Sequence, residues 1–147
     1  MDKVVKAINA NGAVTAYRYT PTGNAESITY PDVGVKQYTY NATGKVLSET
    51  NQNNEETKYT YDKLGRVIST TNPLGNTDTF EYNANGQIAS VTDKNGNTTY
   101  YKYDGNGNII ETIDASGHSS HFEYDIMNHL TQIKLDRSSG QGGTSEL

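Results

Sequence analysis

Short segments of alternating apolar and polar residues run along the chain, and a tyrosine returns every 21 residues. The segments are about seven residues long, rich in Thr, Val, Ile, Tyr and Phe, and bounded by Asn, Asp and Gly, which is typical of β-strands between tight turns. Glycine or Asn-Gly interrupts the chain about every ten residues, too often for a stable α-helix. The pattern therefore predicts an all-β protein. The recurring tyrosines are Tyr19, Tyr40, Tyr61, Tyr82, Tyr103 and Tyr124.

Three other positions recur in register with each tyrosine. Another aromatic residue stands two places before it, namely Tyr17, Tyr38, Tyr59, Phe80, Tyr101 and Phe122. A glycine stands four places after it, namely Gly23, Gly44, Gly65, Gly86 and Gly107, with Asn128 in the sixth copy. An aliphatic residue stands two places beyond that, namely Val46, Val67, Ile88, Ile109 and Leu130, with Ala25 in the first copy. We expect these residues to be structural, with the rings packing and the glycines forming turns of positive φ.

Each 21-residue repeat is expected to contain two strands and two turns. In the third repeat the strands are predicted at about residues 66–71 and 76–82, with turns at 72–75 and 83–86. Because short turns join antiparallel neighbours, the chain predicts a meander of about thirteen strands. Such a wide sheet is expected to curl or spiral as one continuous antiparallel layer. Since side chains alternate between faces, one face is expected to carry a double stripe of aromatic rings that stack laterally from unit to unit.

The repeat predicts the domain organisation. Residues 1–135 form the expected array, with a partial repeat at 1–18, repeats that start at 19, 40, 61, 82 and 103, and a partial repeat from 124. Residues 136–147 are polar and rich in Gly and Ser, and are expected to be a tail or linker. Both ends interrupt the repeat in mid-unit, which favours a piece of a longer protein.

Composition narrows the classes of function. Only 33% of residues are apolar and the mean hydropathy is −0.79, so little dry core is expected. The absence of cysteine excludes disulfides and thiolate metal sites. A net charge of −5 with scattered Lys and Arg gives no electrostatic footprint for nucleic acid. No apolar run reaches membrane-spanning length, and residues 1–10 have no signal-peptide core, so an exported parent would carry its signal upstream.

The pattern Tyr-Asp/Asn-x-x-Gly-x-Val/Ile, written here as YDKLGRV, YNANGQI and YDGNGNI, resembles the YD repeats of Rhs proteins. Similar repeats occur in wall-associated toxins of Gram-positive bacteria, insecticidal toxin-complex subunits and teneurins. The resemblance covers about residues 4–134. It implies β-hairpins in a spiral sheet which, in long arrays, closes into a shell around a toxin or other cargo. The plug domains, core-terminating segment and autoproteolytic site of such shells are not recognisable in this chain.

The resemblance implies a non-catalytic scaffold segment of a secreted or cell-surface parent, with no cofactor. The alternative is a module that binds carbohydrate or protein through its tyrosine-rich face. Expected partners are further YD repeats of the parent, or other copies of this chain that pair through edge strands near residues 4–9 and 129–135 into homo-oligomers. Toxin cargo or a glycan is a further possible partner.

Two sets of residues invite a metal-site interpretation. His118, His121 and His129 lie close in sequence, but other repeats carry Asn, Tyr, Arg or Gln at their positions, which favours variable surface sites. The segments that begin at Asp93 and Asp104 resemble calcium loops, yet neither meets the spacing of an EF-hand loop. Turn chemistry is the better interpretation of both segments.

Overall fold

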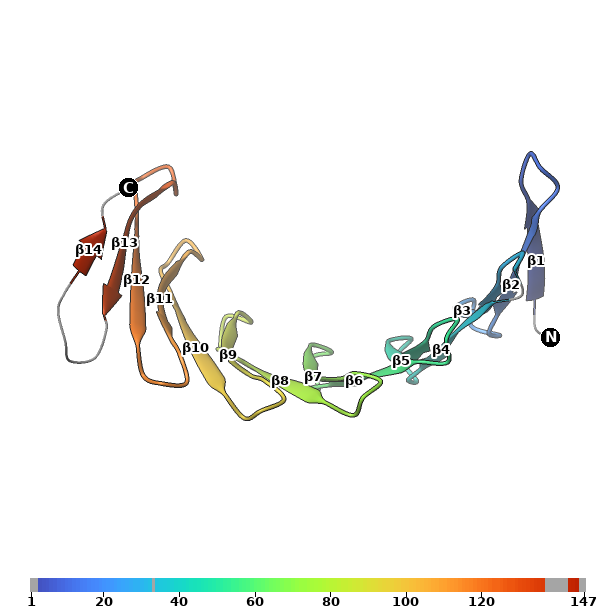
Figure 1. Ribbon diagram of the computed structural model, residues 1–147, viewed down its shortest axis with the longest axis horizontal. Helices are drawn as coiled ribbons and strands as arrows, with labels where there is room; N and C mark the ends of the chain where they lie inside the picture. Colours follow the sequence, from blue (N-terminus) through green and yellow to red (C-terminus); the bar gives the residue numbers. More distant parts are fainter. Residues whose placement is uncertain (1–2, 33, 137–142, 146–147) are drawn as a thin grey trace. The chain divides into compact units, whose positions relative to one another are not determined.

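The computed structural model describes residues 3–32, 34–136 and 143–145 (Figure 1). In these residues it contains fourteen β-strands and no helix, so no helix there is long and apolar enough to cross a membrane. The chain divides into two compact units, Met1–Thr77 and Asp78–Leu147.

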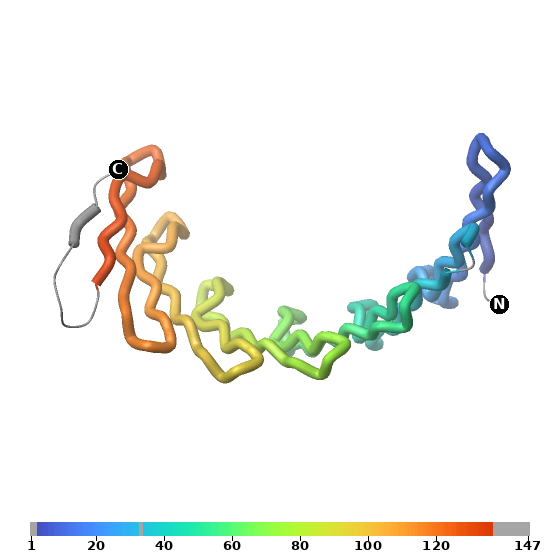
Figure 2. The backbone as a smooth tube through the Cα atoms, in the orientation of Figure 1, coloured from blue at the N-terminus to red at the C-terminus, as the bar shows by residue number. Residues whose placement is uncertain are grey.

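Consecutive strands in each unit pair antiparallel in the order of the sequence (Figure 2). The first unit holds β1 (Lys3–Ile8), β2 (Val14–Tyr19), β3 (Ala25–Thr29), β4 (Val35–Tyr40), β5 (Val46–Thr50), β6 (Glu56–Tyr61) and β7 (Val67–Thr71). The second holds β8 (Thr77–Tyr82), which starts at the last residue of the first unit, then β9 (Ile88–Thr92), β10 (Thr98–Tyr103), β11 (Ile109–Ile113), β12 (Ser119–Tyr124), β13 (Leu130–Asp136) and β14 (Gly143–Ser145).

The predicted all-β fold of tandem repeat hairpins is confirmed. The strands predicted at 66–71 and 76–82 are β7 and β8, each shorter by one residue at its start. The sequence did not predict β14, which lies in the segment expected to be a tail and pairs with Ile133–Leu135 of β13. A terminal strand presents unpaired backbone groups, and even a polar, glycine-rich segment can bond to them. β13 also continues through Asp136, and the rest of the expected tail, at 137–142 and 146–147, lies outside the described residues.

Each tyrosine-bearing strand meets the next strand through a β-bulge. Tyr40 lies opposite Val46, while its neighbour Thr39 lies opposite Ser48, so Leu47 is the extra residue on β5. The same irregularity recurs at the equivalent position of every repeat described, namely Glu26, Ile68, Ala89, Ile110 and Thr131. A bulge bends the strand and increases its local twist.

The described residues contain no buried apolar side chain. The buried residues are two serines, Ser48 and Ser90, with 7% and 3% of their surface exposed. Along β4, Tyr38 and Tyr40 are half-buried while Thr39 between them is exposed, which is the predicted alternation. Each unit is therefore a single layer of strands whose aromatic side chains are only partly covered.

Candidate functional site

The tyrosine hydroxyl provides a side-chain contact between one repeat and the one before it, in addition to the backbone ladder. In four repeats it donates a hydrogen bond to the backbone carbonyl of the aliphatic residue fifteen positions earlier. The pairs are Tyr40 with Ala25 at 2.6 Å, Tyr61 with Val46 at 2.7 Å, Tyr103 with Ile88 at 2.8 Å and Tyr124 with Ile109 at 2.9 Å. Burial raises the pKa of Tyr40, Tyr61 and Tyr103, which keeps these hydroxyls protonated as donors.

These hydrogen bonds explain a difference between the two aromatic positions. The second position is always tyrosine, whereas the first is phenylalanine at Phe80 and Phe122. In the part of the chain that the structure describes, the bond between repeats is made by the hydroxyl of the second position. The sequence pattern alone predicted ring packing for both positions, although the unequal tolerance of phenylalanine already signals a different role for the second one.

The rings do not stack from repeat to repeat in the way the sequence suggested. Equivalent rings are separated by an intervening strand, which places them about 9–10 Å apart. A close ring pair is found within one strand instead, where the Tyr38 and Tyr40 centroids are 6.4 Å apart with planes inclined by 32°. Besides the backbone ladder between their strands, neighbouring repeats are therefore joined by the hydroxyl bond and by side chains at the turns.

The turns are closed by their first side chain. In the turn after β6, Asp62 Oδ1 accepts hydrogen bonds from the backbone N–H groups of Leu64 and Arg66, both at 2.9 Å. Gly65 donates its N–H to the Asp62 carbonyl at 3.0 Å and has a φ of 79°. The same arrangement occurs in the turns within repeats and in the turns between repeats, where the side-chain Oδ1 of the first turn residue accepts two backbone N–H groups. The accepting residues are Asn9, Asn41, Asn51, Asn72, Asn83, Asp93, Asp104, Asp114 and Asp125.

The same bonds hold the turn aspartates in their charged form. The N–H of Arg66, assisted by its guanidinium, lowers the pKa of Asp62. The Asn97 side-chain amide is the main cause of the lowered pKa of Asp93, and Asn108 has this role for Asp104. Hydrogen bonds donated to a carboxylate favour ionisation, so turns that begin with aspartate are most stable when that aspartate is charged.

In three repeats the side chain that follows the turn glycine lies over the equivalent glycine of the next repeat. Lys45 lies over Gly65, and its Nζ is 5.7 Å from the centroid of the Tyr61 ring. A Cβ atom at position 65 would collide with Lys45 Cε. Asn24 covers Gly44 and Gln87 covers Gly107, each with an amide nitrogen 3.4 Å from the place of a Cβ atom. No residue pattern in the sequence marks these covering residues, because their chemical type varies among the repeats.

Asn128 takes the glycine position of the sixth copy without breaking the pattern. It has a φ of 64°, a conformation that asparagine adopts more readily than most residues. Its Oδ1 accepts hydrogen bonds from Asn106 Nδ2 at 3.0 Å and Asn108 Nδ2 at 2.9 Å, both in the previous repeat. A polar bridge thus replaces the packing of a side chain on glycine.

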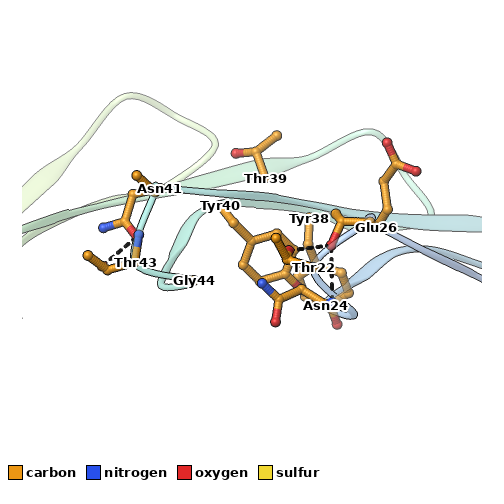
Figure 3. A pocket seen from close by; sticks show the side chains of 11 residues that line it. Thr22, Asn24, Glu26, Tyr38, Thr39, Tyr40, Asn41, Thr43 and Gly44 are labelled. Carbon is orange, nitrogen blue, oxygen red and sulfur yellow. Dashed lines mark hydrogen bonds between the residues drawn. The ribbon is translucent and has the colours of Figure 1, made fainter. Parts of the chain in front are cut away.

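A groove of about 670 Å³ opens between two successive turns of the first unit (Figure 3). It is lined by Thr20, Thr22, Asn24, Glu26, Tyr38, Thr39, Tyr40, Asn41, Ala42, Thr43 and Gly44. Figure 3 shows Tyr40 and Thr22 on one side of the strand, with Thr39 and the Glu26 carboxylate on the other. Several polar groups of the lining are already bonded to one another, such as Thr20 to Thr22 and Asn41 to Thr43. The groove is a gap between turns with no convergent set of chemical groups.

The three histidines lie apart and each has its own aspartate. His118 pairs with Asp114 and His129 with Asp125, both within one turn, and His121 pairs with Asp136 across β12 and β13, all at 3.1 Å. Among the described residues no three His, Asp or Glu side chains come close enough to hold a metal ion.

The repeated sequence matches a known protein family. The family model for the RHS repeat fits residues 40–77, 61–99, 82–118 and 103–138. The chain belongs to the RHS-repeat family. No curated protein matches it.

Solved structures of toxin assemblies share the fold. A chain of the Tc holotoxin pore of Photorhabdus luminescens, with a mutation in TccC3, superposes with a TM-score of 0.70 at 18% identity over 89% of this chain. A chain of the TcdB2–TccC3–Cdc42 crystal structure gives 0.70 at 16% identity over 91% of this chain. The alignments cover 8% and 9% of those chains, so this RHS-repeat chain spans less than a tenth of their length.

Proposed function

We propose that this chain is a non-catalytic segment of a longer RHS-repeat protein and forms part of a β-sheet wall that encloses or presents a toxin or adhesin. The observation that carries the proposal is the hydrogen bond from the tyrosine hydroxyl to the preceding repeat, at 2.6–2.9 Å in four repeats. The bond joins these four repeats to the ones before them in the same way. A sheet built in this way can be lengthened by adding further repeats.

The lack of a core among the described residues supports a wall rather than an enzyme. A repeat without buried apolar side chains depends on its neighbours for stability, as in other repeat proteins. The single layer leaves both faces available to a larger assembly. The similar chains belong to structures of a toxin pore and a toxin complex, which supports a secreted or cell-surface parent.

Duplication of one repeat tests the wall function. A second copy of residues 61–81 is inserted in phase after Glu81, and urea unfolding is followed by circular dichroism. We expect the strand content per residue to be unchanged and the m-value to increase with the added surface. The matched control inserts 21 Gly and Ser residues at the same point. A duplicated repeat that destabilises the chain as much as this linker would contradict the proposal.

Tyrosine nitration separates the wall from the alternative binding module. Tyr61, with its hydroxyl bonded to Val46, is expected to react slowly, and Tyr100, with 52% of its surface exposed, is expected to react fast. Neither rate is expected to change when a panel of glycans is added. Glycan protection of the tyrosine-bearing face would favour the binding module over the wall.

A further inference from the structure

Three turns of the second unit contain an asparagine that is followed directly by glycine. They are Asn85-Gly86, Asn95-Gly96 and Asn106-Gly107, and both residues of each pair are exposed. Asparagine is a chemically labile residue. A following glycine makes it more so, because glycine has no Cβ atom to shield its backbone nitrogen from the asparagine side chain. The second unit therefore carries three places at which the chain can change chemically without an enzyme.

The backbone of these turns protects all three pairs in the same way. Each glycine N–H donates a hydrogen bond to the carbonyl of the first turn residue, at 3.0 Å for Gly86, 2.9 Å for Gly96 and 3.2 Å for Gly107. The bond occupies the nitrogen that would attack the asparagine side chain, so the turn must open before any reaction. Exposed turns open at lower free energy than the paired strands around them. Differences among the three pairs therefore depend on their side chains.

Two of the three asparagine side chains are held in place. Asn106 Nδ2 donates a hydrogen bond to Asn128 Oδ1 at 3.0 Å. The side chain of Asn95 interacts with the Asp93 carboxylate. In the part of the chain that the structure describes, by contrast, no group bonds to the side-chain amide of Asn85. This amide can therefore turn toward the following glycine without first breaking a bond of its own.

The first residue of each turn adds a second difference. Asp93 and Asp104 begin the turns of the other two pairs, and hydrogen bonds hold both aspartates in their charged form. The turn of Asn85 begins instead with Asn83, which is neutral. The attacking glycine nitrogen must first lose its proton, and a nearby carboxylate disfavours this second negative charge. The turn of Asn85 thus lacks both the side-chain contact and the charge that protect the other two pairs.

We propose that Asn85 is a site of spontaneous deamidation and that Asn128 protects Asn106 from the same reaction. The Gly86 backbone nitrogen gives its proton to a solvent base and attacks Cγ of Asn85, where a new C–N bond forms. The C–N bond of the side-chain amide then breaks, and the amide nitrogen takes up a proton and leaves as ammonia. Solvent water opens the resulting succinimide ring at one of its carbonyls. Opening at the side-chain carbonyl gives aspartate, and opening at the backbone carbonyl gives isoaspartate.

The products change the contact between this turn and the next repeat. Isoaspartate adds a methylene group to the backbone, so the Gly86 N–H loses its register with the Asn83 carbonyl. Gln87 follows directly, and its amide nitrogen lies 3.4 Å from the place of a Cβ atom on Gly107 in the next repeat. The modification therefore weakens the array at one defined turn as the protein ages, whether or not the array is a wall.

The full chain, incubated at pH 8 and sampled over weeks, tests the proposal. Proteolysis and mass spectrometry follow the gain in mass at each of the three asparagines. We expect Asn85 to convert about ten-fold faster than Asn106, a factor that corresponds to one further hydrogen bond that must break. In urea the three rates are expected to be equal, since each asparagine precedes a glycine and no folded turn distinguishes them. The rate at Asn85 is expected to fall at pH 6, because fewer glycine nitrogens lose their proton.

Variants of two neighbours test the two causes separately. Asn128→Gly restores the glycine of the preceding repeats and removes the acceptor for Asn106, so it is expected to raise the rate at Asn106 several-fold and to leave that at Asn85 unchanged. Asn128→Asp keeps an acceptor oxygen and is expected to keep Asn106 slow. Asn83→Asp places a carboxylate at the start of the turn and is expected to lower the rate at Asn85. Circular dichroism checks that each variant is folded.

The site at Asn85 is refuted if it stays unconverted in the folded chain, or if Asn95 or Asn106 converts at least as fast. A ranking that persists in urea would also overturn it, because the local sequence and not the fold would then set the rates. An unchanged rate at Asn106 in the Asn128→Gly chain would refute the protective bridge. None of these results depends on the duplicated repeat, so the modification site and the wall function can fail separately.

Discussion

At the scale of single residues, the tyrosine that defines the repeat acts through its oxygen as much as through its ring. Its hydroxyl satisfies a carbonyl one repeat away, while the aromatic residue two places earlier tolerates the loss of a hydroxyl at Phe80 and Phe122. A partly buried acceptor that loses its donor destabilises the fold, because it has already lost part of its contact with water.

We expect Tyr61→Phe to destabilise the chain by about 1 kcal/mol, since the Val46 carbonyl loses its donor. Tyr59→Phe is the matched control and is expected to have a much smaller effect, because phenylalanine occupies that position in two other repeats. Urea unfolding of the two variants measures the difference. Equal losses for both would show that the hydroxyl does not hold the repeats together.

Acid is expected to weaken the turns that begin with aspartate. Hydrogen bonds from Asn97 and its N–H lower the pKa of Asp93 below its ordinary value near 4. The charged Asp93 side chain therefore contributes fully to the stability of the folded chain above about pH 4. This contribution is lost as the pH falls through the lower pKa that Asp93 has in the folded state. Asp93→Asn keeps an acceptor oxygen that does not titrate, so the variant is expected to lose less stability between pH 7 and pH 2.5 than the parent chain.

The reverse change, Asn83→Asp, provides the control for the acid effect. Asn83 already accepts the N–H groups of Asn85 and Gln87 in the same geometry. An aspartate there is expected to increase the loss of stability in acid. Thermal unfolding midpoints of the two variants are measured at pH 7 and pH 2.5. If both variants lose the same stability between these pH values, the turn carboxylates do not cause the acid effect.

At the scale of strands and turns, the repeat is a hairpin whose turn packs on the turn of the next hairpin. Lys45 covers Gly65 and approaches Tyr61, whereas Gly12 has no atom within 4 Å of where a Cβ atom would lie. Both glycines have a φ of 79°. The two positions therefore separate backbone strain from packing between repeats.

We expect Gly12→Ala to cost about 1 kcal/mol from the left-handed backbone alone. Gly65→Ala is expected to cost about 0.5–1 kcal/mol more, because the new methyl group displaces Lys45 from the Tyr61 ring. In the Lys45→Ala background this excess is expected to vanish, which a double-mutant cycle of unfolding free energies measures. An excess that persists without Lys45 would place its cause elsewhere in the turn.

At the scale of the whole molecule, the sequence predicted the features that depend on particular residue types at particular positions. Alternation and Asn-Gly turns located the β7 and β8 strands to within one residue, because both are local signals. The bulge at Leu47 has no residue signature, since its equivalents range from Glu26 to Ala89. The hydroxyl bonds and the residues that cover glycines join positions in different repeats, so they emerged only from the structure.

The same limit applies to the chain's edges, where self-association remains a prediction. The sequence suggested two open edges, but β14 pairs with β13 along Ile133–Leu135, which leaves β1 as the more exposed one. A chain that ends at Asp136 lacks β14, and its β13 backbone groups are free to pair with another copy.

We therefore expect the shortened chain to form larger oligomers than the full chain at equal concentration, as measured by sedimentation velocity. β1 is the same in both chains, so a difference between them isolates the β13 edge. A charged residue on that edge strand, introduced as Ile133→Lys, is expected to reduce the association of the shortened chain. Identical sedimentation of the full and shortened chains would mean that β14 does not protect β13, and that any association proceeds through β1 alone.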